Sequence, residues 1–182
     1  MESNRNIIWI FVILMVLSAL MRFVPHMPNV TPVGALALTA GLYLRRSWAV
    51  IPAILVMVFT DIFVGLYHPG IMLSVYGGFV IMALMASTAK GESKTHMIAP
   101  VLAGSMMFFL ITNAAVWWFS GFYEHTASGL MQSYTLALPF FRNSLIGNFV
   151  YTALFVAVIE YAYAIQSNHA TAKIRKGNEI DQ

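Results

Sequence analysis

Long apolar stretches with very few charges restrict this chain to a membrane more than any other feature does. Residues 47–89 contain a single charged residue, Asp61. Charged residues make up 9% of the whole sequence and apolar residues 59%, whereas a soluble domain carries about 25% charged residues. A soluble domain could not cover its surface with so few charges, so lipid must be the solvent for much of the exterior. We therefore predict an all-α integral membrane protein.

Six apolar segments of this sequence are predicted to form a bundle of about six transmembrane helices. They cover residues 7–24, 32–44, 48–67, 71–89, 97–119 and 141–165. The second is short for a span, because an α-helix rises only about 1.5 Å per residue. A separate interfacial helix is expected at 126–138, with Pro139 setting the start of the last span at Phe141. The length suits one transmembrane domain, residues 1–165, followed by a polar cytoplasmic tail, residues 166–182.

The basic residues gather on one side of such a bundle. If the N-terminus is cytoplasmic, the inner side collects Arg5, Arg45, Arg46, Lys90, Lys94, Lys173, Arg175 and Lys176, and the outer side holds Arg22 and Arg142. This asymmetry follows the positive-inside rule. We expect a multi-pass protein of the bacterial inner membrane with both termini in the cytoplasm. The charges are topology signals on this interpretation, and no nucleic-acid partner is expected.

Polar residues from several predicted helices fall at a similar depth, in the outer third of the membrane. Helix rise places Asp61 roughly 20 Å and Asn113 roughly 24 Å from the inner face. Arg22 lies near the outer end of the first helix, and Arg142 and Asn143 open the last. A pocket open to the outside would explain this convergence. The candidate substrate contacts are Arg22, Asn29, Asp61, Asn113, Trp117, Arg142, Asn143 and Asn148.

Each of these candidates also has a structural explanation. An aspartate inside a span costs about 2.5–3.5 kcal/mol on insertion scales and therefore needs a partner. Arg22 and Arg142 are the expected partners of Asp61, and such a pair could be structural, ligand-binding or proton-coupled. The arginines could instead reach the headgroups, and the asparagines could join helices. Trp117 could belong to an interfacial aromatic belt. An anion near Arg142 would gain from the helix dipole if a helix begins there.

The second predicted helix is rich in small residues. Ala37 and Gly41 stand four residues apart, a spacing that lets two helix backbones approach closely in lipid. These residues could pack against other helices of the same chain, or they could form a docking face for another membrane protein.

Several kinds of chemistry have no sequence support. The chain has no cysteine, which excludes disulfides and thiolate metal sites. His26, His68 and His125 match no metal-ligand spacing. No His-Glu-x-x-His motif, paired aspartates or Ser–His pair appears on the spans, and no Walker A sequence is present. We expect no enzyme activity, no cofactor and no metal.

Three stretches of this sequence carry a resemblance to a known group of proteins. They are the pattern Pro-x-x-Pro-Asn-x-Thr-Pro-Val-Gly-Ala-Leu-Ala-Leu within residues 22–44, Thr60-Asp61-Ile62, and residues 138–148. The chain resembles, over roughly residues 20–160, an uncharacterised bacterial group described as transport proteins. That group is similar to the S-components of energy-coupling-factor (ECF) transporters. The resemblance implies six helices, a ligand site under the first outer loop, and small residues on an early helix that meet a coupling subunit.

These observations lead to two hypotheses about function. The first is a substrate-binding transport subunit that captures a small, vitamin-like organic solute at the outer face. It would work with an ECF-type coupling subunit and ATPases, or by a rocking motion of the whole bundle. The second is a structural or assembly subunit without a substrate, for which the outer polar cluster should be dry and internally paired.

Overall fold

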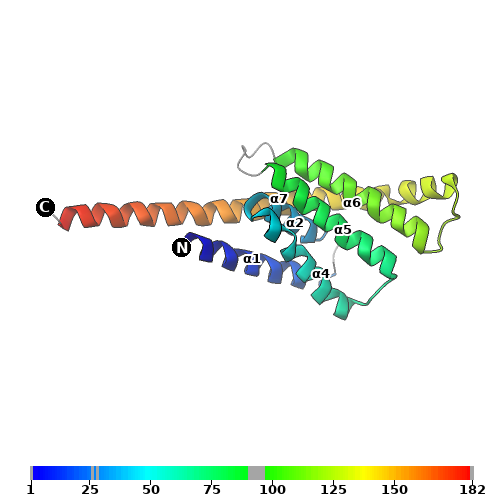
Figure 1. Ribbon diagram of the computed structural model, residues 1–182, viewed down its shortest axis with the longest axis horizontal. Coiled ribbons are helices and arrows are strands. Elements are labelled where there is room, and N and C mark those ends of the chain that lie inside the picture. Colours follow the sequence, from blue (N-terminus) through cyan, green and yellow to red (C-terminus); the bar gives the residue numbers. More distant parts are fainter. Residues whose placement is uncertain (1, 26, 28, 90–96, 181–182) are drawn as a thin grey trace.

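The computed structural model of the chain is helical throughout its regular elements. It describes residues 2–25, 27, 29–89 and 97–180, with side chains described within 6–25, 27, 29–89 and 97–168. The elements are α1 (Glu2–Met21), α2 (Val33–Tyr43), α3 (Arg46–Ala49), α4 (Ile51–Val64), α5 (Pro69–Ala86), the 3-10 turn η1 (Ser87–Ala89), α6 (Ile98–Phe119) and α7 (Ala127–Ile180). The start of α1 and the end of α7 lie toward the same end of the bundle (Figure 1).

Four helical segments in the described chain are long and apolar enough to cross a membrane. They are Arg46–Val64, Pro69–Ala89, Ile98–Phe119 and Ala127–Asn168. Two shorter apolar helices, Asn6–Met21 and Val33–Tyr43, complete the bundle. The expectation of an all-helical chain is confirmed, and four helices are long and apolar enough to cross a membrane. Helix α2, at 11 residues, is too short to span a bilayer, whereas α1 has 20 residues, about the number that a span needs.

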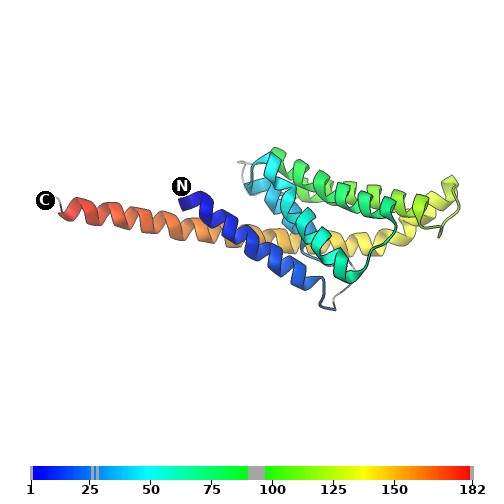
Figure 2. The same cartoon turned by 60° about the horizontal axis from the view of Figure 1, so that its bottom comes forward.

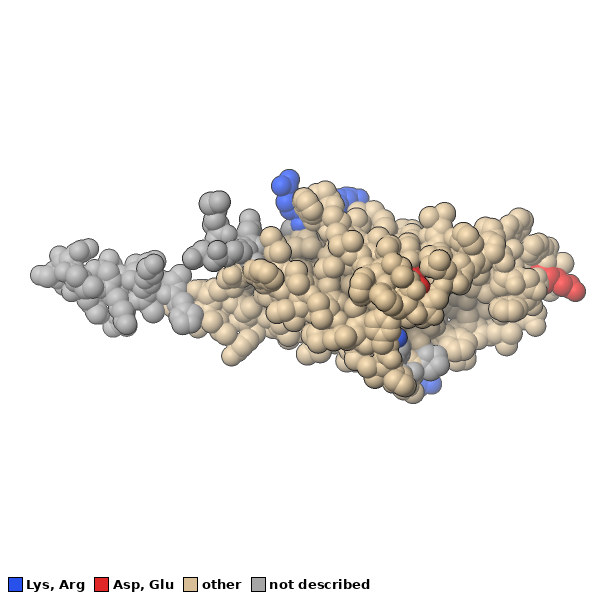
Figure 3. All heavy atoms as spheres, turned by 90° about the horizontal axis from the view of Figure 1, so that it is seen from below, with Lys and Arg blue, Asp and Glu red and all other residues tan. Residues whose placement is uncertain are grey.

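The exterior of the bundle is apolar. Many large apolar side chains on different helices are exposed over more than half of their surface. Examples are Trp9 (62%), Leu73 (74%) and Met131 (71%). On the face seen in Figure 3, Lys, Arg, Asp and Glu side chains form a few small patches among the uncharged residues that are drawn in tan. Apolar area on this scale is not left in water by soluble monomers. Together with four helices that are long and apolar enough to cross a membrane, such an exterior is typical of a membrane protein.

Helix α2 is the centre of the bundle. Every residue from Val33 to Gly41 is buried, because α2 packs against α5, α7, α4 and α1. A helix of 11 residues rises only about 16 Å, too little to span a bilayer. The backbone at the ends of α2 can still lie at membrane depth, because other helices cover it and shield it from lipid.

The burial of α2 corrects the expectation of a docking face at Ala37 and Gly41. Ala37 is 0% exposed. A Cβ atom on Gly41 would lie 2.2 Å from the carbonyl oxygen of Ala83 and 2.7 Å from the Cβ of Ala86. The small residues therefore allow α2 and α5 to approach each other, and they offer no surface to a partner.

The predicted boundary between an interfacial helix and the last span is also wrong. Helix α7 runs without a break through Pro139, as Figure 2 shows. It begins at Ala127, directly after Thr126, whose side-chain oxygen accepts a hydrogen bond from the Gly129 amide at 3.1 Å. Proline is tolerated inside membrane helices where neighbouring groups satisfy the freed carbonyl. Arg142 consequently lies inside a helix, and the proposed gain from a helix N-terminus at this residue is lost.

The end of α2 is tied to α7 by one hydrogen bond. The Tyr43 hydroxyl donates to Glu160 Oε1 at 2.6 Å, and both side chains are half-buried. Tyr43→Phe should lower the free energy of unfolding by about 1–2 kcal/mol, because a hydrogen bond to a charged group is lost. SDS-titration unfolding in mixed micelles measures this loss. Tyr161→Phe, on an exposed ring of the same helix, is the control, and an equal effect of the two changes would contradict the prediction.

Candidate functional site

A cavity of about 460 Å³ opens between the α1–α2 loop and helices α4, α5, α6 and α7. This volume lies in the range of small-molecule sites, about 300–1,000 Å³. Its polar lining residues are Arg22, Asn29, Thr31, Tyr67, Ser105, Thr112, Asn113, Ser144 and Asn148. The remaining lining is mainly Phe, Met, Ile and Val. An apolar cavity with a few polar groups is the usual design of a site for an organic ligand.

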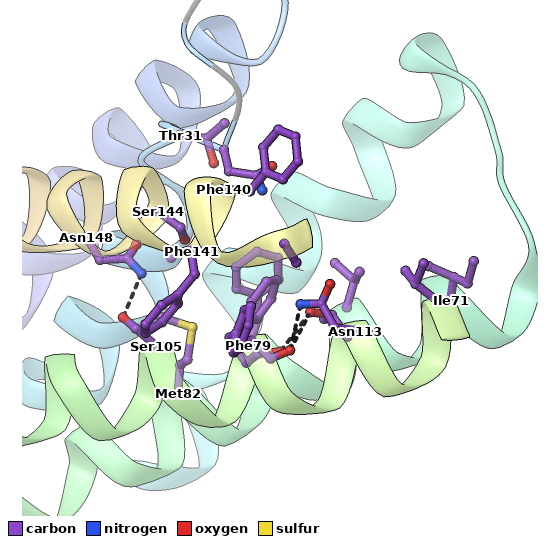
Figure 4. Close-up of a pocket in the computed structure, with 18 of the residues that line it drawn as sticks. Thr31, Ile71, Phe79, Met82, Ser105, Asn113, Phe140, Phe141, Ser144 and Asn148 are labelled. Carbon is purple, nitrogen blue, oxygen red and sulfur yellow. Dashed lines mark hydrogen bonds between the residues drawn. The ribbon is translucent and has the colours of Figure 1, made fainter. Parts of the chain in front are cut away.

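The cavity occupies the end of the bundle opposite the start of α1. Its mouth is formed by Asn29 and Thr31 of the α1–α2 loop and by Tyr67 of the α4–α5 loop. Asn29 adopts a positive φ of 62°, a conformation that asparagine accepts more readily than most residues. The deep end is closed by Ser105 and Asn148, whose side chains are joined by a hydrogen bond of 2.9 Å (Figure 4).

An ion pair stands at one wall of the cavity. Arg22 follows α1, and its Nη2 donates to Asp61 Oδ1 of α4 at 2.7 Å. The Tyr76 hydroxyl of α5 donates to Asp61 Oδ2 at 2.8 Å. Asp61 is 1% exposed, whereas the Arg22 side chain is 15% exposed and lines the cavity. Of the two expected partners of Asp61, Arg22 is confirmed, whereas no ion pair joins Asp61 to the exposed Arg142 in the described structure. The carboxylate lies behind Arg22 rather than on the cavity surface.

Tyr67 stands beside this pair. Burial raises the pKa of the Tyr67 phenol to about 12, with a further rise from Asp61 that Arg22 opposes. Burial disfavours the charged phenolate, so the hydroxyl keeps its proton at neutral pH. The hydroxyl makes no hydrogen bond within the part of the chain that the structure describes. It is therefore a donor that a ligand could use.

Aromatic rings from three helices form the body of the cavity. Phe79 of α5 packs on Phe108 of α6 with ring centroids 4.8 Å apart. Phe109 of α6 packs on Phe141 of α7 with centroids 4.6 Å apart. Figure 4 shows Phe79 and Phe141 between the deep Asn148–Ser105 pair and the more superficial Asn113. These rings offer flat apolar walls for a flat apolar molecule.

Two of the lining asparagines, Asn148 and Asn113, have different surroundings. Asn148 is 4% exposed, and a Cβ atom on Gly34 of α2 would lie 2.3 Å from its Oδ1. Asn148 therefore joins α2, α6 and α7 as well as closing the cavity. Asn113 donates through Nδ2 to the carbonyl of Phe109 at 2.8 Å, which leaves its Oδ1 as an acceptor toward the cavity.

The structure brings together some of the expected contact residues and separates others. Arg22, Asn29, Asn113 and Asn148 line the cavity, and Asp61 supports it from behind. Trp117, Arg142 and Asn143 are not among the lining residues.

The reasons for these exclusions lie in the two helices that carry the three residues. Trp117 donates through Nε1 to the carbonyl of Glu124 at 2.8 Å, so its indole holds the α6–α7 turn. Arg142 is exposed. The lining residues of α7 are Ala137, Phe140, Phe141, Ser144 and Asn148. This spacing of three and four residues marks one helix face, and residues 142 and 143 lie off that face.

The sequence did not single out Tyr67 or the aromatic lining residues. In a membrane helix the lipid-facing and the inward faces are both apolar, so a phenylalanine gives no signal of its direction. Tyr67 beside the His-Pro-Gly turn carried no motif. No group of three His, Cys, Asp or Glu side chains in the described residues could hold a metal ion, and His26 lies outside those residues.

The comparisons with known proteins give one match. Residues 2–172 match a family described as a family of unknown function, DUF6580. No curated protein and no solved structure matches the chain. Since the match covers nearly the whole sequence, the chain belongs to the DUF6580 family.

Proposed function

We propose that this protein is the substrate-binding subunit of a membrane transport system and that it captures a small, vitamin-like organic solute in the cavity. The observation that supports the proposal most is the cavity itself, about 460 Å³ in volume and lined by aromatic rings with a few polar groups. A protein with only a structural role has no need of such a space, since interiors are otherwise packed as densely as organic crystals.

The direction of capture follows from the charge distribution. The positive-inside rule assigns the Arg45–Arg46 side of the bundle to the cytoplasm, and the α1–α2 loop at the cavity mouth then faces outward. Solute would enter from outside, as the resemblance to ECF S-components implies. On this proposal the protein is a bacterial inner-membrane protein with both termini in the cytoplasm.

Release of the solute into the cell requires energy from elsewhere, because the sequence has no Walker A motif. An ECF-type coupling subunit with ATPases would supply it, or the bundle would rock within the membrane. Since Ala37 and Gly41 are buried, a coupling subunit would have to contact another surface.

Blocking the cavity tests the proposal. Ser144 lines the cavity, and Ser144→Trp should fill it with an indole. Protein purified in mild detergent should carry a small organic molecule detectable by mass spectrometry, and Ser144→Trp should reduce its amount at least about tenfold, equivalent to 1.4 kcal/mol of binding energy.

The control is Ile146→Trp, two residues along α7 on a 52% exposed side chain, which should retain the molecule. Enrichment of the same molecules in wild type and Ser144→Trp would overturn the proposal.

One observation favours the second candidate, a structural or assembly subunit. The Arg22–Asp61–Tyr76 cluster is internally paired, as that function predicts. The same blocking experiment separates the two functions, because a purely structural subunit would carry no solute in any of the three proteins.

A further inference from the structure

We infer that the solute is a monoanionic organic acid, whose carboxylate binds Arg22 and whose flat aromatic body lies among the phenylalanine rings. The inference rests on the proposed function and deepens it by naming the class of substrate. It depends on the hydrogen bonds and charges of the cavity wall.

Among the described residues, the guanidinium of Arg22 has one strong acceptor, the Asp61 carboxylate. Its Nη2 donates to the Asp61 carboxylate, and its Nη1 is directed at the thioether sulfur of Met57. A guanidinium has five N–H donors, and a thioether is only a weak acceptor. A ligand carboxylate at Nη1 would replace this weak acceptor with a charged one, and charge-assisted hydrogen bonds are roughly twice as strong as neutral ones.

The charges on the cavity surface favour an anion over a cation or a neutral molecule. Among the described residues that line the cavity, Arg22 is the formally charged one and none is acidic. Asp61 is 1% exposed and lies behind the guanidinium. A ligand carboxylate at Nη1 would thus be closer to the positive charge than to the negative one, and Coulomb attraction exceeds repulsion when the attracting charge is nearer.

A second donor stands near the same place. Tyr67 lines the same cavity as Arg22, and its hydroxyl makes no hydrogen bond in the described chain. Arg22 and Tyr67 could therefore donate to the two oxygens of one carboxylate. Arg22 is the positively charged residue among the described lining residues, and one guanidinium matches one acidic group of the ligand.

The aromatic walls define the rest of the ligand. Phe79 and Phe109 are 7% and 8% exposed and lie in the two ring pairs that line the cavity. Offset or edge-on contacts with these rings favour a flat aromatic body over a saturated one. Asn113 Oδ1 and the Ser105–Asn148 pair leave room for one or two polar atoms along that body.

Matched probes test this class of ligand with the full chain in detergent. Isothermal titration calorimetry would compare biphenyl-4-carboxylate with its neutral isostere biphenyl-4-carboxamide and with the saturated bicyclohexyl-4-carboxylate. We expect biphenyl-4-carboxylate to bind about tenfold more tightly than the carboxamide, and more tightly than the saturated acid. In the double variant Arg22→Gln/Asp61→Asn, which replaces the ion pair with two amides, the preference for the carboxylate over the carboxamide should disappear while affinity for the carboxamide remains.

The inference is overturned by equal or tighter binding of the carboxamide, by a preference that survives in the double variant, or by saturable binding of none of the probes. Tighter binding of the saturated acid would overturn the aromatic part of it. Failure of this inference can be told from failure of the proposed function by Ser144→Trp. If the probes show the wrong preference but Ser144→Trp still removes the co-purifying molecule, the solute site stands and only its ligand class is wrong.

Discussion

Replacing Arg22 with alanine should lower the free energy of unfolding by about 3–5 kcal/mol, the cost of leaving a buried charge without its partner. Asp61 is 1% exposed and accepts hydrogen bonds from Arg22 and from Tyr76. Without Arg22 the carboxylate would keep only the Tyr76 hydroxyl. SDS-titration unfolding in mixed micelles measures the loss.

The double variant Arg22→Gln/Asp61→Asn is the control for this experiment. It removes both charges together and should recover more than half of the lost stability, because no uncompensated charge remains buried. A loss below about 1 kcal/mol in Arg22→Ala, the typical value for an exposed pair, would show that the ion pair does not hold α1 to α4.

The second large effect is expected at the contact between α2 and α5. Gly41→Ala should destabilise the protein by about 2–3 kcal/mol, as overpacking of a dense core does. The added Cβ would meet the Ala83 carbonyl oxygen at 2.2 Å and the Cβ of Ala86 at 2.7 Å. Neither is the end of a flexible side chain, so the two helices would have to move apart. The thermal midpoint in detergent should fall accordingly.

Gly77→Ala is the matched change on α5. A Cβ at Gly77 has nothing within 4 Å, so this substitution should be neutral or should stabilise the helix by up to about 1 kcal/mol. Equal effects of the two substitutions would mean that the loss at Gly41 does not come from close helix packing.

The sequence alone was enough to predict that lipid surrounds much of this protein and that its architecture is a bundle of helices. Too few charges to cover a soluble surface, together with apolar runs, predict membrane helices whatever their packing. The cost of a lone charge in lipid also marked Asp61 as a residue that needs a partner, with Arg22 and Arg142 as the two candidates. These conclusions follow from composition and helix rise, which do not depend on contacts between helices. The structure selected Arg22 as the partner of Asp61.

Only the tertiary structure decided which side of each helix faces the cavity. Lipid and protein interior are both apolar, so hydrophobicity cannot show the rotation of a membrane helix about its axis. That rotation is set by packing, such as the contacts of Gly34 with Asn148 and of Gly41 with Ala83. The same packing buried α2, let α7 continue through Pro139 and turned Phe141 inward while Arg142 remained exposed.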